Sequence, residues 1–373
     1  MAVSRVLKAE ITYNPMKMIQ VGTGSWGEHW CRDFLPPNIK EGLVEVVAAV
    51  DLNPQALERA RSFLGLRQDQ CYTDPQKAFA DCRADFCTVV VPPEFHENVV
   101  DLALFHDLHI LSEKPIADSL LGSVRIADKV RKSDKKMAVT MSHRFDQDKT
   151  TFRNELRSGR FGPLDYLICR FTCDTRKFGT WGKSRYQMKD PLLVQGAVHQ
   201  LDILADLAGA KCETLYAQTW NPSWGEYAGD SQGLVMMQFE NGVHAVYEGA
   251  KTNAVGLNCW KNDYIRAECC EATVILDRRQ LEYFPYDPSG RWKTGVAGQG
   301  QSISLLDQPK WANTWLIEKF VRWIRDGDPM ETNVEDNLQS VALIFSAIKS
   351  AQTGGPVAVQ TLLRETQNQV LKE

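Results

Sequence analysis

The sequence contains no run of apolar residues long enough to cross a membrane, since a spanning helix needs about 18 or more of them in succession. It also has no excess of positive charge, because 43 lysines and arginines stand against 47 aspartates and glutamates, for a net charge of −4. A nucleic-acid surface normally needs a basic face. We therefore expect neither a membrane nor a nucleic acid as a partner.

The sequence has ten cysteines but no pair in CxxC spacing. Paired spacing is typical of structural zinc sites, so we expect no bound metal. Residues 1–15 lack the continuous apolar stretch and the small-residue cleavage site of a secretory signal. Scattered cysteines in a chain without such a signal are expected to be reduced, mostly buried thiols. These features predict a cytoplasmic protein.

A chain of 373 residues is longer than one hydrophobic core usually covers, so two domains are expected. The first 145 residues alternate short apolar runs with segments of helical spacing, which predicts βαβ units and a parallel sheet. The expected strands cover residues 16–21, 43–50, 86–91, 109–111 and 137–141, and the expected helices cover 54–64, about 97 onward and 119–132.

A glycine-rich motif follows the first expected strand and precedes a helix; it reads Gly22-Thr23-Gly24-Ser25-Trp26-Gly27. Asp51 closes the next expected strand. This arrangement is the fingerprint of a dinucleotide-binding loop. Its first glycine permits a tight turn, its second lets the backbone approach the pyrophosphate, and its third allows the helix to pack closely on the strand.

Asp51 bears on the choice of cofactor. A carboxylate at this position accepts hydrogen bonds from the adenosine ribose and repels a 2′-phosphate. Leu52 and Asn53 provide no arginine to neutralise such a phosphate. We therefore expect NAD rather than NADP, although a simple helix-capping role for Asp51 stays open because Pro54 follows so closely.

Three further motifs follow in order: Val91-Pro92-Pro93-Glu94-Phe95-His96, Ser112-Glu113-Lys114-Pro115 and Gly196-Ala197-Val198-His199-Gln200-Leu201-Asp202. Together with the glycine motif, they resemble the glucose–fructose oxidoreductase / inositol dehydrogenase family (Gfo/Idh/MocA family), from about residue 16 to about residue 357. The resemblance implies an N-terminal Rossmann domain over 1–145 and a C-terminal α+β domain over 146–373 with a large, open, mostly antiparallel sheet. It also implies an NAD(H)-dependent oxidoreductase that moves a hydride to or from a secondary alcohol carbon of a sugar, glycoside, sugar derivative or cyclitol.

The second half of the sequence agrees with such a sheet. Strand-like runs occur at 164–173, 213–220, 233–239, 243–249, 264–268 and 273–276. Asn241-Gly242 between two of them is a strong hairpin signal. Because family members commonly pair these sheets face to face, the resemblance implies a homodimer or homotetramer.

Lys114 and His199 are the expected catalytic residues. By resemblance, Lys114 contacts the substrate oxygen and the nicotinamide ribose, acts as a proton donor or an electrostatic clamp, and joins Pro115 through a cis peptide. A neutral histidine accepts a hydroxyl proton near pH 7, which suits His199. A buried structural role for this histidine remains the alternative.

One position departs from the family pattern. The family usually has an acidic residue, often aspartate, four residues before this histidine, whereas this sequence has Gln195. An amide hydrogen-bonds a hydroxyl but does not shuttle a proton. Either Lys114 and His199 share the proton transfer, or another group supplies it, or activity has been lost.

The other expected site residues divide into two groups. By resemblance, Pro92, Pro93, His96 and Glu113 join the glycine motif and Lys114 at the cofactor, and Gln195, Arg144, Arg176, Trp181 and Arg185 are the expected substrate contacts. A structural ion pair for Arg144 and a packing role for Trp181 stay open. The glycine-rich stretch 286–310 is expected to be a long loop that acts as a lid or an oligomer contact.

Two other functions compete with a dehydrogenase. One is an NAD-dependent glycosidase, which oxidises a ring carbon transiently and cleaves a glycoside without net redox change. The other is a non-catalytic sensor that binds NAD, which Gln195 keeps open. Because a fold does not fix a function, the sugar, the carbon and the direction of the reaction stay undetermined by the sequence.

Overall fold

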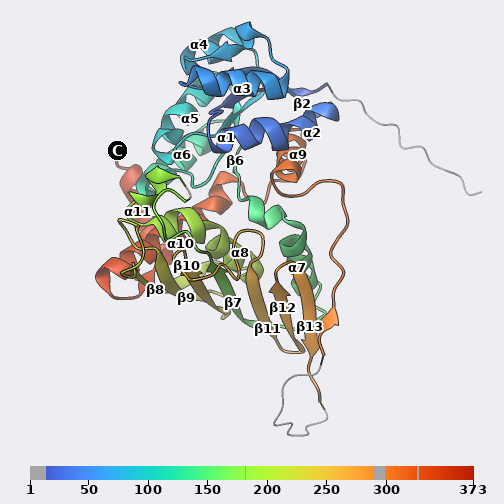
Figure 1. The fold of residues 1–373 in the computed structure, drawn as a ribbon, viewed down its shortest axis with the longest axis vertical. Coiled ribbons are helices and arrows are strands. Elements are labelled where there is room, and N and C mark those ends of the chain that lie inside the picture. The colour runs from blue at the N-terminus through green and yellow to red at the C-terminus, as the bar shows by residue number, and fades with distance from the viewer. Residues whose placement is uncertain (1–13, 181, 289–298, 326) are drawn as a thin grey trace, which may run out of the picture.

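The structure is a computed structural model that describes residues 14–180, 182–288, 299–325 and 327–373. It contains two sheets, one in the N-terminal part of the chain and one in the C-terminal part (Figure 1). The fold is therefore the expected pairing of a Rossmann domain with a large open-sheet domain.

The first sheet is parallel and six-stranded. Its strands are β1 (Met16–Val21), β2 (Val44–Val50), β3 (Cys71–Tyr72), β4 (Phe86–Val89), β5 (His109–Ser112) and β6 (Met137–Val139). They lie in the order β3-β2-β1-β4-β5-β6, which is the order of dinucleotide-binding Rossmann sheets. The strands predicted over 86–91 and 137–141 each end two residues sooner, because the chain leaves the sheet before Pro92 and before the 3-10 turn Ser142–Phe145.

Helices connect these strands. They are α1 (Trp26–His29), α2 (Leu35–Lys40), α3 (Pro54–Leu64), α4 (Pro75–Asp81), α5 (His96–Phe105) and α6 (Leu120–Lys132), with a π-helical stretch over Trp30–Phe34. The start of α3 follows from its sequence, because the Asn53 side chain accepts the backbone N–H of Gln55 and Pro54 occupies the first turn. Asn53, rather than Asp51, is thus the cap of this helix.

The second sheet has nine strands. They are β7 (Leu164–Thr172), β8 (Cys212–Trp220), β9 (Gln232–Phe239), β10 (His244–Ala250), β11 (Tyr264–Cys269), β12 (Ala272–Asp277), β13 (Gln280–Pro285), β14 (Gln301–Ser302) and β15 (Val357–Ala358). All described pairs are antiparallel except that between β7 and β10. The predicted hairpin joins β9 to β10, and Gly242 in its turn has φ +85°.

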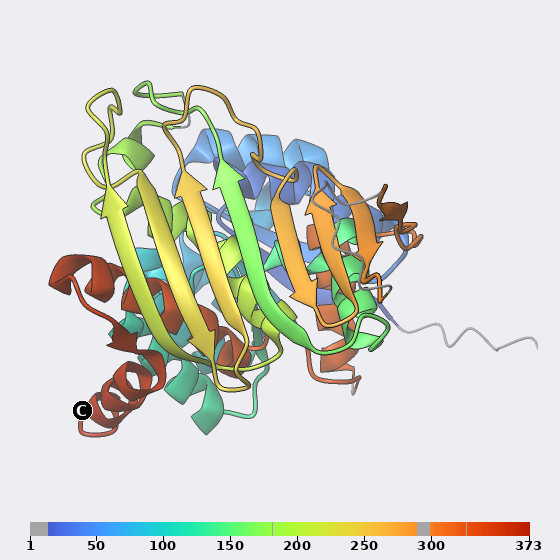
Figure 2. The same cartoon turned by 90° about the horizontal axis from the view of Figure 1, so that it is seen from below.

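Helices cover one face of the second sheet and leave the other open (Figure 2). The helices in the part of the chain after residue 145 are α7 (Gln147–Arg157), α8 (Val198–Ala208), α9 (Ala312–Ile324), α10 (Val334–Thr353) and α11 (Val359–Val370). Of the stretch 286–310, part forms the short strand β14, and residues 289–298 lie outside the described residues. The expected lid or oligomer contact there stays a prediction.

The late helix α9 packs against the Rossmann domain rather than the second sheet. Its buried residues Leu316 and Phe320 belong to the same core as Met18 and Trp30, and the Phe320 ring meets Phe86 of β4 edge to face at 5.5 Å. The chain thus returns to its N-terminal half after building the second sheet. The domain boundary at residue 145 stays a prediction.

The ten cysteines are free thiols, and five of them are buried. Within the described ranges, no helix combines the length and the apolar character needed to cross a membrane.

Candidate active site

The glycine motif has room only for glycine at its first and third positions. Gly22 has φ +85°, and a Cβ atom there would lie 2.1 Å from the backbone oxygen of Val90. A Cβ atom at Gly27 would lie 2.3 Å from the backbone oxygen of Gly22. A Cβ atom at Gly24 would meet only ordinary contacts, the nearest being Asp51 Oδ2 at 3.7 Å. The first and third glycines therefore allow close packing, as the motif predicts.

Asp51 fixes the conformation of this loop. Its Oδ2 accepts the backbone N–H of Thr23 at 2.7 Å and that of Gly24 at 2.9 Å, and it also accepts the Thr23 hydroxyl at 3.2 Å. The carboxylate thus lies against the loop that would hold a pyrophosphate. A glycine cradle with an adjacent carboxylate fits an adenine dinucleotide whose ribose lacks a 2′-phosphate.

Glu113 connects the glycine loop with the end of β5. The indole Nε1 of Trp26 donates to Glu113 Oε1 at 2.7 Å, and that of Trp30 donates to the same oxygen at 2.9 Å. The backbone N–H of Lys114 donates to Glu113 Oε2 at 3.2 Å. Trp26, expected at the cofactor with the rest of the glycine motif, therefore orients the carboxylate next to the expected catalytic lysine.

His96 connects the segment after β4 with the segment after β5 through contacts to backbone oxygens of both. It is fully buried, and its two ring nitrogens lie 3.1 Å from the backbone oxygen of Ile116 and 2.9 Å from that of Val91. Burial lowers the pKa of His96. Pro92 and Pro93 form the turn just before it. His96 therefore shapes the edge of the expected cofactor site by holding its backbone.

Lys114 joins the two domains. The Lys114–Pro115 peptide is cis, and the half-buried side chain donates from Nζ to the backbone oxygen of Gln195 at 3.2 Å. Burial lowers the pKa of Lys114 to about 8, although Glu113 acts in the opposite direction. Nearby Arg185 lowers this pKa further. The amine is thus poised to exchange a proton near neutral pH.

His199 lies four residues after Gln195, at the start of α8. Its buried ring stacks on His143 with 4.0 Å between centroids, and Trp260 packs edge-on against both rings. Burial, followed by the charges of His143, Lys114 and Lys149, holds the pKa of His199 well below its usual value. The imidazole is therefore neutral in the folded protein and able to accept a proton.

Gln195 contacts a second lysine, which was not among the site residues predicted from the sequence. Lys251, which follows β10, is fully buried and donates from Nζ to Gln195 Oε1 at 3.0 Å and to the backbone oxygen of Pro191 at 3.2 Å. Burial lowers the pKa of Lys251 to about 7. Nothing in the local sequence distinguishes a buried lysine at the end of an apolar strand from an exposed one, so the burial of Lys251 could not be predicted. The structure thus brings Lys114, Gln195, His199 and Lys251 together.

Arg144 lies in a buried ion pair. Its Nε and Nη2 donate to the two carboxylate oxygens of Asp202, each at 2.7 Å, and both side chains are buried. Asp206 and Asp336 also lie within ion-pair distance of this guanidinium. This geometry supports the structural alternative for Arg144 rather than a substrate contact.

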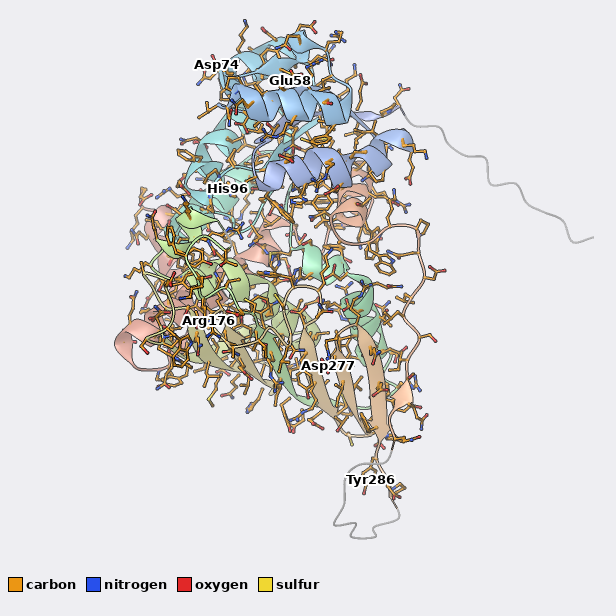
Figure 3. All side chains as sticks on the ribbon, in the orientation of Figure 1. Glu58, Asp74, His96, Arg176, Asp277 and Tyr286 are labelled. Atoms are coloured by element: carbon orange, nitrogen blue, oxygen red, sulfur yellow. The ribbon has the colours of Figure 1, made fainter. Side chains whose placement is uncertain are left out.

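The remaining expected substrate contacts lie on the segment between β7 and α8. Arg176 donates to Asp174 Oδ1 at 2.9 Å, and Figure 3 shows it in the second domain, whereas His96 lies in the first. Arg185 is half-buried and close enough to Lys114 to lower its pKa. Trp181 lies outside the described residues.

The fold and this constellation define the class of protein, an NAD-binding Rossmann domain followed by an α/β domain. Two family models match the chain: "Oxidoreductase family, NAD-binding Rossmann fold" over residues 16–141 and "Oxidoreductase family, C-terminal alpha/beta domain" over residues 153–359. The chain belongs to this Gfo/Idh/MocA oxidoreductase family, and its cofactor is NAD.

Known proteins resemble the chain over half of its length or more. An uncharacterized protein, y4oX, from Sinorhizobium fredii is 51% identical over 93% of this chain and 97% of its own. Inositol 2-dehydrogenase from Corynebacterium glutamicum is 30% identical over 52% of this chain and 56% of its own. An Agrobacterium radiobacter oxidoreductase, solved with NAD+, L-tartaric acid and magnesium, has a TM-score of 0.79 at 19% identity, covering 94% of this chain and 100% of its own. The structural similarity shows the fold alone.

Proposed function

We propose that the chain is an NAD-dependent dehydrogenase or reductase that acts on a secondary alcohol of a sugar-like or cyclitol substrate. Membership of the oxidoreductase family supports this, and relatives include enzymes named inositol 2-dehydrogenase, D-apiose dehydrogenase and D-glucoside 3-dehydrogenase. The observation that carries the proposal is the hydrogen bond between Lys114 Nζ and the Gln195 backbone oxygen. It places an amine from the Rossmann domain beside the segment that bears His199.

Oxidation of a secondary alcohol removes a hydride from the carbon and a proton from the hydroxyl. Bound NAD supplies the carbon that accepts the hydride. We assign the hydroxyl proton to the neutral imidazole of His199, because its low pKa leaves it unprotonated. The ammonium of Lys114 donates a hydrogen bond to the substrate oxygen and stabilises the negative charge that develops there. Reduction of the ketone uses the same groups in reverse.

The neighbours of these two residues suit the assignment. Stacking on His143 and the edge of Trp260 fix the plane of the His199 ring. The paired indoles on Glu113 hold the backbone from which Lys114 projects. Both groups therefore meet the substrate in a defined orientation, which is a large part of their effect on rate.

NADH absorbance tests the proposal. The purified protein is mixed with NAD and a panel of monosaccharides, sugar acids, glycosides and inositols. Net NADH formation with a released keto product is the expected result. Glycoside cleavage without net NADH would indicate the NAD-dependent glycosidase instead, and NAD binding without any turnover would indicate a sensor.

We also infer that the chain forms a homo-oligomer through the open face of its nine-stranded sheet (Figure 2). Alternate residues of β9 are buried under helices, whereas Leu234 and Met236 are 44% and 58% exposed. Large apolar side chains on an uncovered sheet face are typical of an interface.

A further inference from the structure

Lys251 determines the orientation of the Gln195 side-chain amide. Lys251 Nζ donates to the amide oxygen, Gln195 Oε1, at 3.0 Å. The NH₂ group therefore points away from Lys251. One neighbour of that nitrogen is the sulfur of Met188 at 2.6 Å, a weak acceptor. Gln195 thus has a hydrogen-bond donor in its side chain, which the carboxylate of the family pattern lacks.

Two lysines contact Gln195, and an arginine lies close to both of them. Lys114 bonds the backbone oxygen of Gln195 and Lys251 bonds its side-chain oxygen. Arg185 lies close enough to both lysines to lower the pKa of each, and Lys114 likewise lowers that of Lys251. Burial lowers the pKa of Arg185 as well. Lys114 and Arg185, joined below about pH 7 by the charged form of Lys251, therefore repel one another in a partly buried region. An anion placed among them would relieve that repulsion.

The carboxylate beside Lys114 is already engaged. Glu113 accepts hydrogen bonds from both indoles and from the Lys114 backbone. These bonds hold it toward the glycine loop, on the Rossmann side of the lysine. Its negative charge acts on Lys114, whose pKa it raises, whereas Arg185 and Gln195 belong to the second domain.

We propose that the substrate carries an anionic group, a carboxylate or a phosphate, that binds to the Gln195 amide NH₂ and Arg185, close to the reacting oxygen at Lys114. The proposal rests on the proposed function, because it names the substrate class of the same site. Bidentate donation from a guanidinium is well suited to either oxyanion. Lys251 is fully buried, so it is a positioning residue that acts through Gln195.

The experiment compares anionic probes with their neutral parent. NADH formation is measured with D-glucuronate, D-glucose 6-phosphate and D-glucose, and D-gluconate is compared with D-glucitol. The readout is the ratio of kcat/KM for the acid to that for the neutral sugar. We expect a ratio of at least about 10 for one anionic class, which corresponds to about 1.4 kcal/mol. The carboxylate and phosphate arms identify the source of the anion.

Four variants and a control locate the effect. Arg185→Gln and Gln195→Asp should each lower the ratio about 10-fold or more, the first by removing a cation and the second by adding a repelling carboxylate. Lys251→Met should lower the ratio through Gln195, whereas Lys251→Arg, which keeps the donor, should restore part of it. Arg160→Gln removes an arginine that pairs with Glu155 on the surface, and the ratio should not change.

The outcomes separate the two proposals. NADH formation with a ratio near one, unaltered by these variants, would overturn the anionic substrate and leave the dehydrogenase standing. If no probe gives NADH, calorimetry with the NAD-loaded protein decides: binding of an anionic probe that weakens in Arg185→Gln upholds the anion site and contradicts the dehydrogenase. Failure of every anionic probe to bind would overturn the anion site.

Discussion

Replacing Lys251 with methionine is expected to stabilise the fold below about pH 7. Burial lowers the pKa of this lysine from 10.5 to about 7, and one pKa unit corresponds to about 1.4 kcal/mol. The charged form is thus disfavoured in the folded protein by about 5 kcal/mol relative to the neutral amine. Methionine keeps the aliphatic volume and loses two hydrogen bonds to Pro191 and Gln195, worth about 1 kcal/mol each. The free energy of unfolding should therefore rise by about 3 kcal/mol.

The sign of the pH dependence follows from proton binding. Between pH of about 7 and 10.5, Lys251 keeps its proton in the unfolded chain but loses it in the folded one. The unfolded state then binds more protons, so the wild-type protein gains stability as the pH rises. The methionine variant lacks this titration, so its advantage should shrink across the same window. Denaturant unfolding at several pH values measures both effects.

Lys149 provides the matched control. It is equally buried, but its Nζ lies 2.8 Å from Asp263 Oδ2, and neighbouring carboxylates raise its pKa despite burial. Lys149→Met would leave Asp263 buried without its partner, so we expect a loss of about 3–5 kcal/mol. If Lys251→Met destabilises the protein as strongly as Lys149→Met, the reasoning about Lys251 is wrong.

Three further perturbations test the proton transfer, the cofactor site and the interface. Because the pKa of Lys114 is about 8, kcat/KM for oxidation should fall above about pH 8 as Nζ loses its proton, and Lys114→Arg should remove that fall in a pH profile of NADH formation. Asp51→Ala should weaken NAD binding about 10-fold or more and NADP binding less, because the carboxylate holds the loop amides of Thr23 and Gly24; fluorescence titration compares the two cofactors. Met236→Glu, which places a charge on the open sheet face, should shift the mass measured by light scattering toward the monomer, and an unchanged oligomer would count against that interface.

The Rossmann half was predictable because its signals are local. Buried parallel strands are short apolar runs, and β1 and α3 have the expected bounds. The glycine motif likewise depends on contacts between neighbouring segments. Strands β13 and β15 and the short β14 were not expected. The residues of β13 alternate weakly although it pairs with the preceding strand β12, and β14 and β15 are only two residues long, with β15 paired to the distant β8.

The late helices and much of the site depend on contacts across long sequence distances. Helix α9 buries Phe320 against β4, more than 200 residues earlier in the chain, and nothing near α9 indicates which domain it joins. Trp26 and Glu113 meet across 87 positions, and Lys251 and Gln195 across 56. The sequence predicted Gln195 as a site residue that departs from the family pattern. Only the fold shows that Lys251 is the lysine that contacts its side chain.

The most direct test of the central claim is NADH formation by Lys114→Ala and His199→Ala, measured with the best substrate of the panel, beside the NAD affinity of each variant. The account predicts that each substitution lowers turnover about 100-fold or more, while NAD binds with much less change. Full turnover in both variants would contradict the assignment of the proton transfer to these two residues.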